Sequence, residues 1–536
     1  MSTVKTPPEP VSEPLPSAEE LLERNRVLDS RCLRMDERIV LLEQQNEWLK
    51  EQLGLRKSKA FAPSSEATRE AHPELCFNEA EALSSPEVPE PTTLTITYRR
   101  AKTKGKRADD LSRLPVEEIR HELPESEQVC PQCNGHLHEM GCDTRDEVEM
   151  VPATVKVKRH LKIKYACRHC DHNGTGSPVI TAEAPAPAFP GSLATPSFVA
   201  WIAGQKFELG LPYYRIEYYL DGRGIVLSRQ TMANWVMRGA GMLEPLLERM
   251  KVLLLKREVL HADETTLQVL HEDGRDATTK SYMWLYRGGR DGPPLILFDY
   301  QTTRTAQRPR EYLAGFEGFL HVDGCNVYEK LPGVTLVGCW AHARRKFDEV
   351  LRTLPKGPRT PLGTIAQEGL NFCNRLFKID SELRDCTPEQ RHAARLERSV
   401  PLLRDFEAWL AVQGPIVLPQ SGLGRAVAYC RNQWPKLQNF LRDGRLELDN
   451  NRAERSIKPF VIGRKNWLFS NTPKGARSSA LMYSLVETAK ENGLIPTAYL
   501  QYLFERMPTI DTSDDSQLDA LLPWMPEVHA ACKLSG

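Results

Sequence analysis

The chain has 536 residues, more than one hydrophobic core usually organises, so several domains are expected. Its hydrophobic fraction of 40% and charged fraction of 26% are typical of a globular protein in water. It contains no run of about 18 apolar residues, which argues against a membrane span. The 71 basic and 71 acidic side chains cancel, so contacts with nucleic acid would have to come from local basic patches. The first residues lack the pattern of a secretion signal, which favours the cytoplasm.

The N-terminal part is expected to form a coiled coil. Residues 1–16 are rich in Pro, Ser and Glu and are expected to be disordered. Across residues 17–57 a heptad repeat predicts a parallel leucine zipper with a seam of Leu21, Leu28, Met35, Leu42 and Leu49. Polar Asn25 and Asn46 stand at partner positions, where they would fix the register. The alternative is an amphipathic helix packed on its own chain; we expect a homodimer or a higher oligomer.

Residues 58–125 show no sustained periodicity and are expected to be a disordered basic linker. Pro, Ser and Glu dominate the segment up to about residue 92, and the run YRRAKTKGKR at 98–107 is strongly basic. Such a run is often only solvated, but it can also hold DNA phosphates without reading the base sequence. Both interpretations stay open.

Residues 126–180 contain two Cys-x-x-Cys pairs, which predict a zinc-binding ribbon. Four thiolates at this spacing suit a structural, tetrahedral Zn²⁺ site with the ligands Cys130, Cys133, Cys167 and Cys170. The alternative is two unconnected pairs of buried or redox cysteines. Between the pairs the sequence alternates like β-strands and carries several lysines, so the ribbon is expected to contact DNA.

Residues 185–248 predict a helical region that resembles a helix-turn-helix DNA-binding unit. A helix, a glycine-containing turn and a second helix capped by Ser228 follow one another in 211–241. The second helix would present three polar side chains to DNA, namely Arg229, Gln230 and Asn234. Many helix pairs that only pack together share this pattern, so that alternative stays open.

Residues 250–485 change to an α/β pattern and contain two similar segments, VLHADET and FLHVDG. In each segment a short apolar run predicts a buried strand that ends at an aspartate, Asp263 in the first and Asp323 in the second. Further elements are expected between them: strands at 281–288 and 294–300 and a helix near 305–315. This order of strands and helix predicts a mixed sheet of the ribonuclease H-like type.

A third acid, Glu454, lies in the expected helix of 448–469, after a helical insertion at about 351–440. Three carboxylates would suit two Mg²⁺ or Mn²⁺ ions about 4 Å apart, the arrangement that activates the attacking oxygen in phosphodiester cleavage. Each acid has a structural alternative, because aspartates also end turns and Glu454 can pair with Asn451 or Lys458. Competing acids lie nearby, namely Glu264, Asp299, Glu447 and Asp449.

At these residues the sequence resembles a known family. The segments HADET, HVDGCNVYEKL, GCWAHARRKFDEV and DNNRAERSIKPFVIGRKNWLF are similar to transposases of the insertion sequence 66 family. The resemblance implies a multidomain α/β protein whose ribonuclease H-like catalytic core carries a DDE triad, here Asp263, Asp323 and Glu454. It also implies a C-terminal element, expected at 486–536, and a place near the bacterial nucleoid. The implied partners are the terminal inverted repeats, target DNA and small accessory proteins, with no membrane.

Two details stay open within this resemblance. Many DDE transposases carry a basic residue seven positions after the glutamate, where this chain has Val461. Three nearby cations are the alternatives for holding DNA phosphate, namely Arg455, Lys458 and Lys465. Cys339 and His342 resemble metal ligands, but without a second pair beside them a packing role is expected.

The expected function is metal-dependent hydrolysis at the ends of an insertion sequence, followed by transfer of the freed 3′-hydroxyl into target DNA. No covalent protein–DNA intermediate is expected. One alternative is a DNA-binding repressor with a zipper and a zinc site whose core has lost catalysis. Another is a structure-specific nuclease of the same fold, which would cut without joining.

Overall fold

The computed structural model describes residues 22–32, 34–35, 38, 49, 156–166, 179–181, 185–353 and 361–533. The four predicted zinc ligands and much of the heptad seam lie outside these residues. Contacts divide the chain into two compact units, each considered by itself below. Residues Lys251–Val461 make up most of one unit, and the described parts of Tyr98–Met250 together with Ile462–Gly536 make up the other.

The N-terminal residues 22–32 are helical and exposed. Two seam residues, Leu28 within this segment and Met35 beyond it, are 53% and 57% exposed. In the predicted ribbon, strands β1 (Lys164–Ala166) and β2 (Val179–Thr181) pair antiparallel. Of the alternating segment between the cysteine pairs, residues 156–163 have no regular secondary structure and only Lys164–Ala166 form a strand, so the prediction holds there alone.

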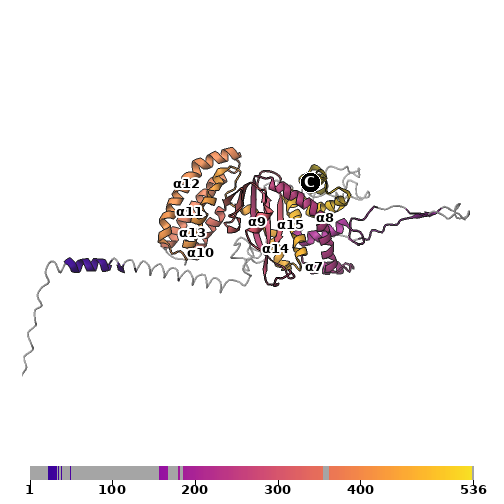
Figure 1. The fold of residues 1–536 in the computed structure, drawn as a ribbon, viewed down its shortest axis with the longest axis horizontal. Helices are drawn as coiled ribbons and strands as arrows, with labels where there is room; N and C mark the ends of the chain where they lie inside the picture. The colour runs from indigo at the N-terminus through magenta and orange to yellow at the C-terminus, as the bar shows by residue number, and fades with distance from the viewer. Residues whose placement is uncertain are drawn as a thin grey trace, which may run out of the picture. The chain divides into compact units, whose positions relative to one another are not determined.

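A five-stranded mixed sheet forms the centre of the first unit (Figure 1). Its strands are β3 (Val259–Gln268), β4 (Lys280–Gly288), β5 (Ile296–Gln301), β6 (Gly318–Val322) and β7 (Val334–Gly338). Their order is β5-β4-β3-β6-β7; β3, β4 and β5 pair antiparallel, whereas β6 is parallel to both β3 and β7. A short helix, α9 (Gln307–Tyr312), connects β5 to β6. The predicted order of three strands, a helix and a strand is confirmed.

One boundary prediction for this sheet is wrong. Asp323 does follow β6 directly, but Asp263 does not end its strand, because β3 continues through Gln268. The reason is the β3–β4 hairpin, in which pairing extends as far as Gln268 opposite Lys280 and carries the polar residues after Asp263 into the ladder. Asp263 therefore lies in the middle of the central strand.

Four long helices follow the sheet and lie side by side as a bundle (Figure 1). They are α10 (Trp340–Thr353), α11 (Pro361–Glu382), α12 (Pro388–Ile416) and α13 (Gly422–Leu437). Helix α12 begins with a capping box between Thr387 and Gln390. Large aromatic side chains fill the bundle core; Trp340, for example, lies 6.0 Å from both Phe406 and Trp434 by ring centroids. The expected helical insertion is thus a packed bundle. Helix α14 (Asn451–Trp467) follows it and begins in the first unit.

The second unit is helical. Its described helices include α6 (Pro196–Ala203), α7 (Tyr213–Asp221), most of α8 (Arg229–Leu255), α15 (Pro473–Glu491), α16 (Pro496–Arg506), α17 (Asp515–Asp519) and α18 (Pro526–Cys532). The expected helix pair is present as α7 and α8, with Gly224 at φ +75° in the turn between them. Ser228 accepts the Thr231 N–H at 3.2 Å and so caps α8 as expected.

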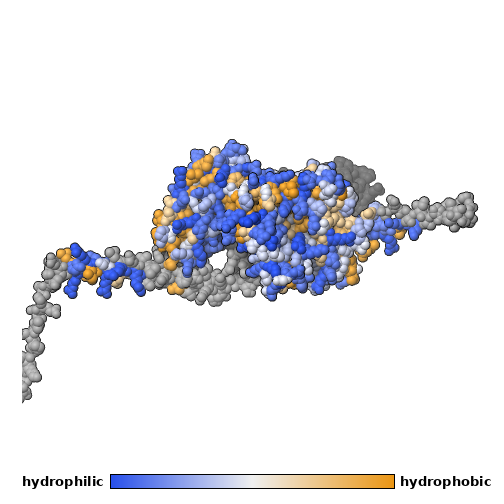
Figure 2. All heavy atoms as spheres, in the orientation of Figure 1, coloured by the Kyte–Doolittle hydropathy of each residue, from blue (hydrophilic) through white to orange (hydrophobic). Residues whose placement is uncertain are grey.

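The surface carries mostly hydrophilic residues with scattered hydrophobic ones on the face that Figure 2 shows. None of the helices in the described parts of the chain is long and apolar enough to cross a membrane.

Candidate active site

Parallel pairing of β3 and β6 brings the two predicted aspartates together. His261 is paired with His321, so Asp263 and Asp323 each stand two residues beyond a paired position. Burial raises the pKa of Asp263 well above its usual value, and the negative charge of Asp323 raises it further. The Asp323 carboxylate accepts the Cys325 N–H at 3.0 Å, which fixes its side chain at the strand end.

Glu454 joins the two aspartates from the first turn of α14. Its charge also raises the pKa of Asp263, so the three predicted acids lie in one electrostatic neighbourhood. Its Oε1 lies 3.6 Å from Nδ1 of His342, and its Oε2 lies 3.5 Å from Arg345. Among the described residues no bond joins it to Asn451 or Lys458, the structural partners considered from the sequence.

A buried polar network fixes α14 against the central strand. Asn450 is 1% exposed and stands directly before α14. Its side-chain amide donates to the Ala262 carbonyl at 2.9 Å, so its Oδ1 accepts from Nδ1–H of His261, also at 2.9 Å. Its backbone N–H donates to the Cys339 sulfur at 3.2 Å. One residue thereby ties β3, the end of β7 and the helix that carries Glu454.

Two imidazoles support this network from the sheet. His261 and His321 are fully buried and stack with ring centroids 4.2 Å apart. Burial lowers the pKa of His261 to about 4, and burial together with the neighbouring His261 lowers that of His321 as well. Both rings are therefore neutral at physiological pH and act as packing and hydrogen-bonding groups.

Cys339, His342 and Glu454 place a sulfur, a nitrogen and an oxygen within 4.8 Å of one another. Burial raises the pKa of Cys339 to about 12, and its sulfur already accepts the Asn450 N–H, so the neutral thiol fits the expected packing role. The contacts of His342 and Arg345 with Glu454 were not foreseen from the sequence. The available signal was their spacing of three, which places both on one face of the helix after β7.

The competing acids all have structural partners. Glu264 is paired with Arg304 and accepts the Tyr328 hydroxyl at 2.7 Å. Asp299 accepts from the Gln301 amide at 2.9 Å. Asp449 accepts the N–H of the first residue of α14 at 3.0 Å. Glu447 is ion-paired with two arginines, at 2.7 and 2.6 Å.

The predicted DNA-contacting residues are at least partly accessible. Three residues on the first turns of α8 are exposed: Arg229, Gln230 and Asn234. Helix α14 runs unbroken through Pro459 and Gly463 and carries exposed Arg455 and half-buried Lys458 and Lys465. Val461 is buried, so this position serves packing instead of DNA contact.

Comparison with protein families agrees with the resemblance of the sequence motifs. The model of the Transposase IS66 family matches residues 191–478, and that of the IS66 C-terminal element matches 484–524. The zinc-finger binding domain of transposase IS66 matches 127–171, and a model described as Transposase C of IS166 homeodomain matches 48–119. These matches extend over most of the chain.

Similar proteins occur in Sinorhizobium fredii (strain NBRC 101917 / NGR234). The uncharacterized protein y4jD is 35% identical over 75% of this chain and 78% of its own length. The uncharacterized protein y4hP is 30% identical over 74% of this chain and 73% of its own. The uncharacterized protein y4qI is 31% identical over 72% of this chain and 71% of its own. Together with the family matches, these likenesses show that the chain belongs to the IS66 family of transposases.

Proposed function

We propose that this transposase hydrolyses a phosphodiester bond at each end of its insertion sequence and transfers the freed 3′-hydroxyl into target DNA. The proposed catalytic residues are Asp263, Asp323 and Glu454. The observation that carries the proposal is the convergence of the three acids on one buried site, where burial and then the charges of Asp323, Glu264 and Glu454 raise the pKa of Asp263 well above its usual value. Such a concentration of like charge is unfavourable unless a cation or a proton neutralises it, and it is typical of functional sites.

The sheet supports the same reading. We infer a ribonuclease H-like core from the order β5-β4-β3-β6-β7, with three antiparallel strands followed by two parallel ones. In this arrangement the acids come from the central strand, the end of its parallel neighbour and the helix that follows the bundle.

The three acids fit Mg²⁺ or Mn²⁺. Carboxylate oxygens are the ligands that these cations prefer. Oε1 of Glu454 is buried and has no hydrogen-bond partner within the described part of the chain, so it is available as a ligand. A bound divalent cation would supply activation of the attacking oxygen and stabilisation of the leaving oxygen. The chain itself orients the acids, with Asn450 fixing α14 and Arg345 contacting the other oxygen of the Glu454 carboxylate at 3.5 Å.

The remaining parts would recognise and pair the DNA ends. The match to the zinc-finger model at 127–171 supports a structural Zn²⁺ held by Cys130, Cys133, Cys167 and Cys170. We assign recognition of the inverted repeats to this ribbon and to helix α8 with Arg229, Gln230 and Asn234. The N-terminal zipper would join two chains, and accessory proteins of the same element are further partners.

The first experiment measures cleavage and strand transfer of labelled element-end DNA with Mg²⁺ or Mn²⁺. Three nearly isosteric variants, Asp263→Asn, Asp323→Asn and Glu454→Gln, should each lose about a thousandfold or more in rate, because several kcal/mol of charge stabilisation disappears. The control Asp299→Asn should retain activity, because that acid lies on β5. Replacing Mg²⁺ by Ca²⁺ should leave DNA binding intact and stop cleavage.

Other outcomes separate the alternatives. A wild-type protein that binds ends but never cuts, even with accessory proteins, would be a repressor. Cleavage without joining would indicate a nuclease. A triad variant that still cuts would show that its acid was wrongly assigned, and a protein–DNA adduct stable to denaturation would exclude direct attack by water.

A further inference from the structure

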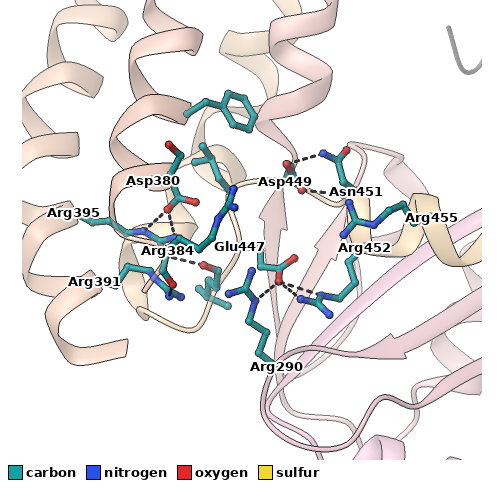
Figure 3. Close-up of a pocket in the computed structure, with 14 residues that line it drawn as sticks. Arg290, Asp380, Arg384, Arg391, Arg395, Glu447, Asp449, Asn451, Arg452 and Arg455 are labelled. Carbon is teal, nitrogen blue, oxygen red and sulfur yellow. Dashed lines mark hydrogen bonds and ion pairs between the residues drawn. The ribbon is translucent and has the colours of Figure 1, made fainter. Parts of the chain in front are cut away.

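A cavity of about 260 Å³ lies between the helical bundle and the segment that leads into α14 (Figure 3). The residues 377–395 of the bundle form one side, and Arg290 with residues 446–455 forms the other. Six arginines line it: Arg290, Arg384, Arg391, Arg395, Arg452 and Arg455. The lining carboxylates are Asp380, Glu447 and Asp449. Cations therefore outnumber acids in the wall of this arginine pocket.

The acids of the pocket are already occupied. Glu447 accepts from Arg290 at 2.7 Å and from Arg452 at 2.6 Å. Asp380 accepts from the Arg395 guanidinium at 2.5 Å. Figure 3 shows both groups of contacts as dashed lines on the pocket wall. These carboxylates therefore balance part of the positive charge and leave a surplus.

Arg391 adds positive charge that no acid balances through an ion pair within the described part of the chain. Its guanidinium donates only to backbone carbonyl oxygens: those of Leu383, Arg384, Cys386 and Gly444. These bonds tie the turn after α11 to the loop before α14, so the two walls of the pocket are held at a fixed separation. A rigid wall with unbalanced charge is suited to hold an anion without reorganisation.

Two pocket arginines are free to meet a ligand. Arg384, in the turn after α11, and Arg455, on α14, are both exposed. Neither guanidinium makes a hydrogen bond or an ion pair with another described residue; burial raises the pKa of Asp449, and the charge of Arg455 only opposes that rise. Arginine guanidinium groups bind phosphate oxygens in a bidentate fashion, which makes a phosphate ester the best-matched ligand.

The position of the pocket indicates which phosphate it would hold. Arg455 directly follows Glu454 in the sequence, so the pocket adjoins the helix turn that carries the third acid. We propose that the arginine pocket binds a backbone phosphate of the DNA strand near the scissile phosphate, with Arg384 and Arg455 as its ligands. This inference rests on the proposed function, because it takes the acid triad as the place of cleavage. The helical bundle is thereby a DNA-binding element as well as a scaffold.

The test is the salt dependence of DNA binding. Full-length protein in Ca²⁺, which blocks cleavage, is titrated onto labelled element-end DNA over a range of salt concentrations. Arg384→Gln and Arg455→Gln should each reduce the slope of log affinity against log salt by about one, as expected for one lost phosphate contact. Arg384→Gln should leave the thermal midpoint unchanged, because the Arg384 guanidinium makes no contact that stabilises the described fold.

Arg404→Gln is the matched control. Arg404 is an exposed arginine on α12 that does not line the pocket, so its removal lowers the net charge equally. If Arg404→Gln changes the slope as much as Arg384→Gln, the effect is general electrostatic attraction and the pocket assignment is wrong. If neither pocket variant changes the slope, the proposal is overturned.

Free phosphate is the alternative ligand of the pocket, because it presents the same phosphate oxygens to the arginines. Inorganic phosphate and pyrophosphate are therefore titrated into wild type and Arg384→Gln by calorimetry. Binding of these anions to wild type alone, with unchanged DNA binding of the variant, would make the pocket a site for free phosphate and overturn the DNA assignment. If wild type fails to cut in Mg²⁺ while Arg384→Gln still lowers the salt slope, the triad proposal fails and the phosphate site stands.

Discussion

A single buried amide connects the parts of the candidate site. Asn450 contacts His261, Ala262 and Cys339, which belong to the central strand and to the start of the bundle. The first turn of α14 also depends on it, because the Glu454 N–H donates to the Asn450 carbonyl at 3.2 Å. The position of Glu454 relative to Asp263 is therefore set by a residue that itself need not touch DNA or metal.

We predict that Asn450→Ala reduces DNA cleavage far more than it reduces DNA affinity. The substitution leaves a buried imidazole N–H and a buried carbonyl unpaired, which should lower the free energy of unfolding by about 2–4 kcal/mol. The rate should fall because α14 is no longer held at the strand. Single-turnover cleavage, end-DNA affinity and urea unfolding measure the three effects.

Asn439→Ala is the control for this prediction. Asn439 donates one hydrogen bond to the Leu336 carbonyl at 2.8 Å. It precedes α14 in the sequence, and this hydrogen bond does not involve α14. The substitution should lower the free energy of unfolding by about 1 kcal/mol and leave the cleavage rate unchanged. Equal losses of cleavage and DNA affinity in Asn450→Ala would mean that the residue serves folding alone.

At the scale of elements, the bundle holds the turn that carries Asp323. On helix α13, the Tyr429 hydroxyl donates to the Asp323 carbonyl at 3.0 Å, and the Gln433 amide donates to the Gly324 carbonyl at 3.4 Å. Gly324 has φ +99°, and a Cβ there would lie 3.2 Å from the Tyr429 hydroxyl. The turn is thus constrained both by its own backbone and by close approach of the bundle.

Gly324→Ala should destabilise the protein by about 1 kcal/mol or more and reduce cleavage strongly, because it moves the Asp323 turn away from α13. Gly274→Ala is a matched control with φ +71° and nothing within 4 Å of the added Cβ. It carries the same kind of backbone strain without the close contact. Thermal unfolding and cleavage rates compare the two; similar losses of activity in both would refute the role of the bundle contact.

The elements also show what the sequence can and cannot predict. The strand order from β3 to β6 follows from apolar runs, and the approach of Asp263 and Asp323 follows from parallel pairing. The extension of β3 was missed, because pairing with β4 outweighs the polar character of its second half. The contact between Arg345 and Glu454 joins residues 109 positions apart, and only packing of the bundle determines it. Strand β7 is short and was missed as well.

At the scale of the whole molecule, we propose that the N-terminal helix joins two chains through its apolar seam. We predict that Leu28→Lys combined with Met35→Lys converts a dimer into a monomer, because two charges would be buried in the seam. Val27→Lys is the control, since Val27 is equally apolar and 56% exposed but lies outside the seam. Light scattering should give the double variant half the mass of the wild type, and Val27→Lys the same mass as the wild type. An unchanged mass of the double variant would show that the chains associate through another surface.

The long separation between the acids also determines when a newly made chain becomes complete. Glu454 is synthesised 131 residues after Asp323, a delay of about 7 to 26 seconds at a translation rate of about 5 to 20 residues per second. Until then the ribbon, helix α8 and both aspartates have already been made, while the third acid is missing. A chain cut short within the bundle would contain helix α8 but lack both Glu454 and residues Ile462–Gly536, which belong to the same compact unit as most of α8. We therefore expect a prematurely terminated copy of the gene to give a product that neither cuts DNA nor completes its helical unit, so it would not compete with intact copies at element ends.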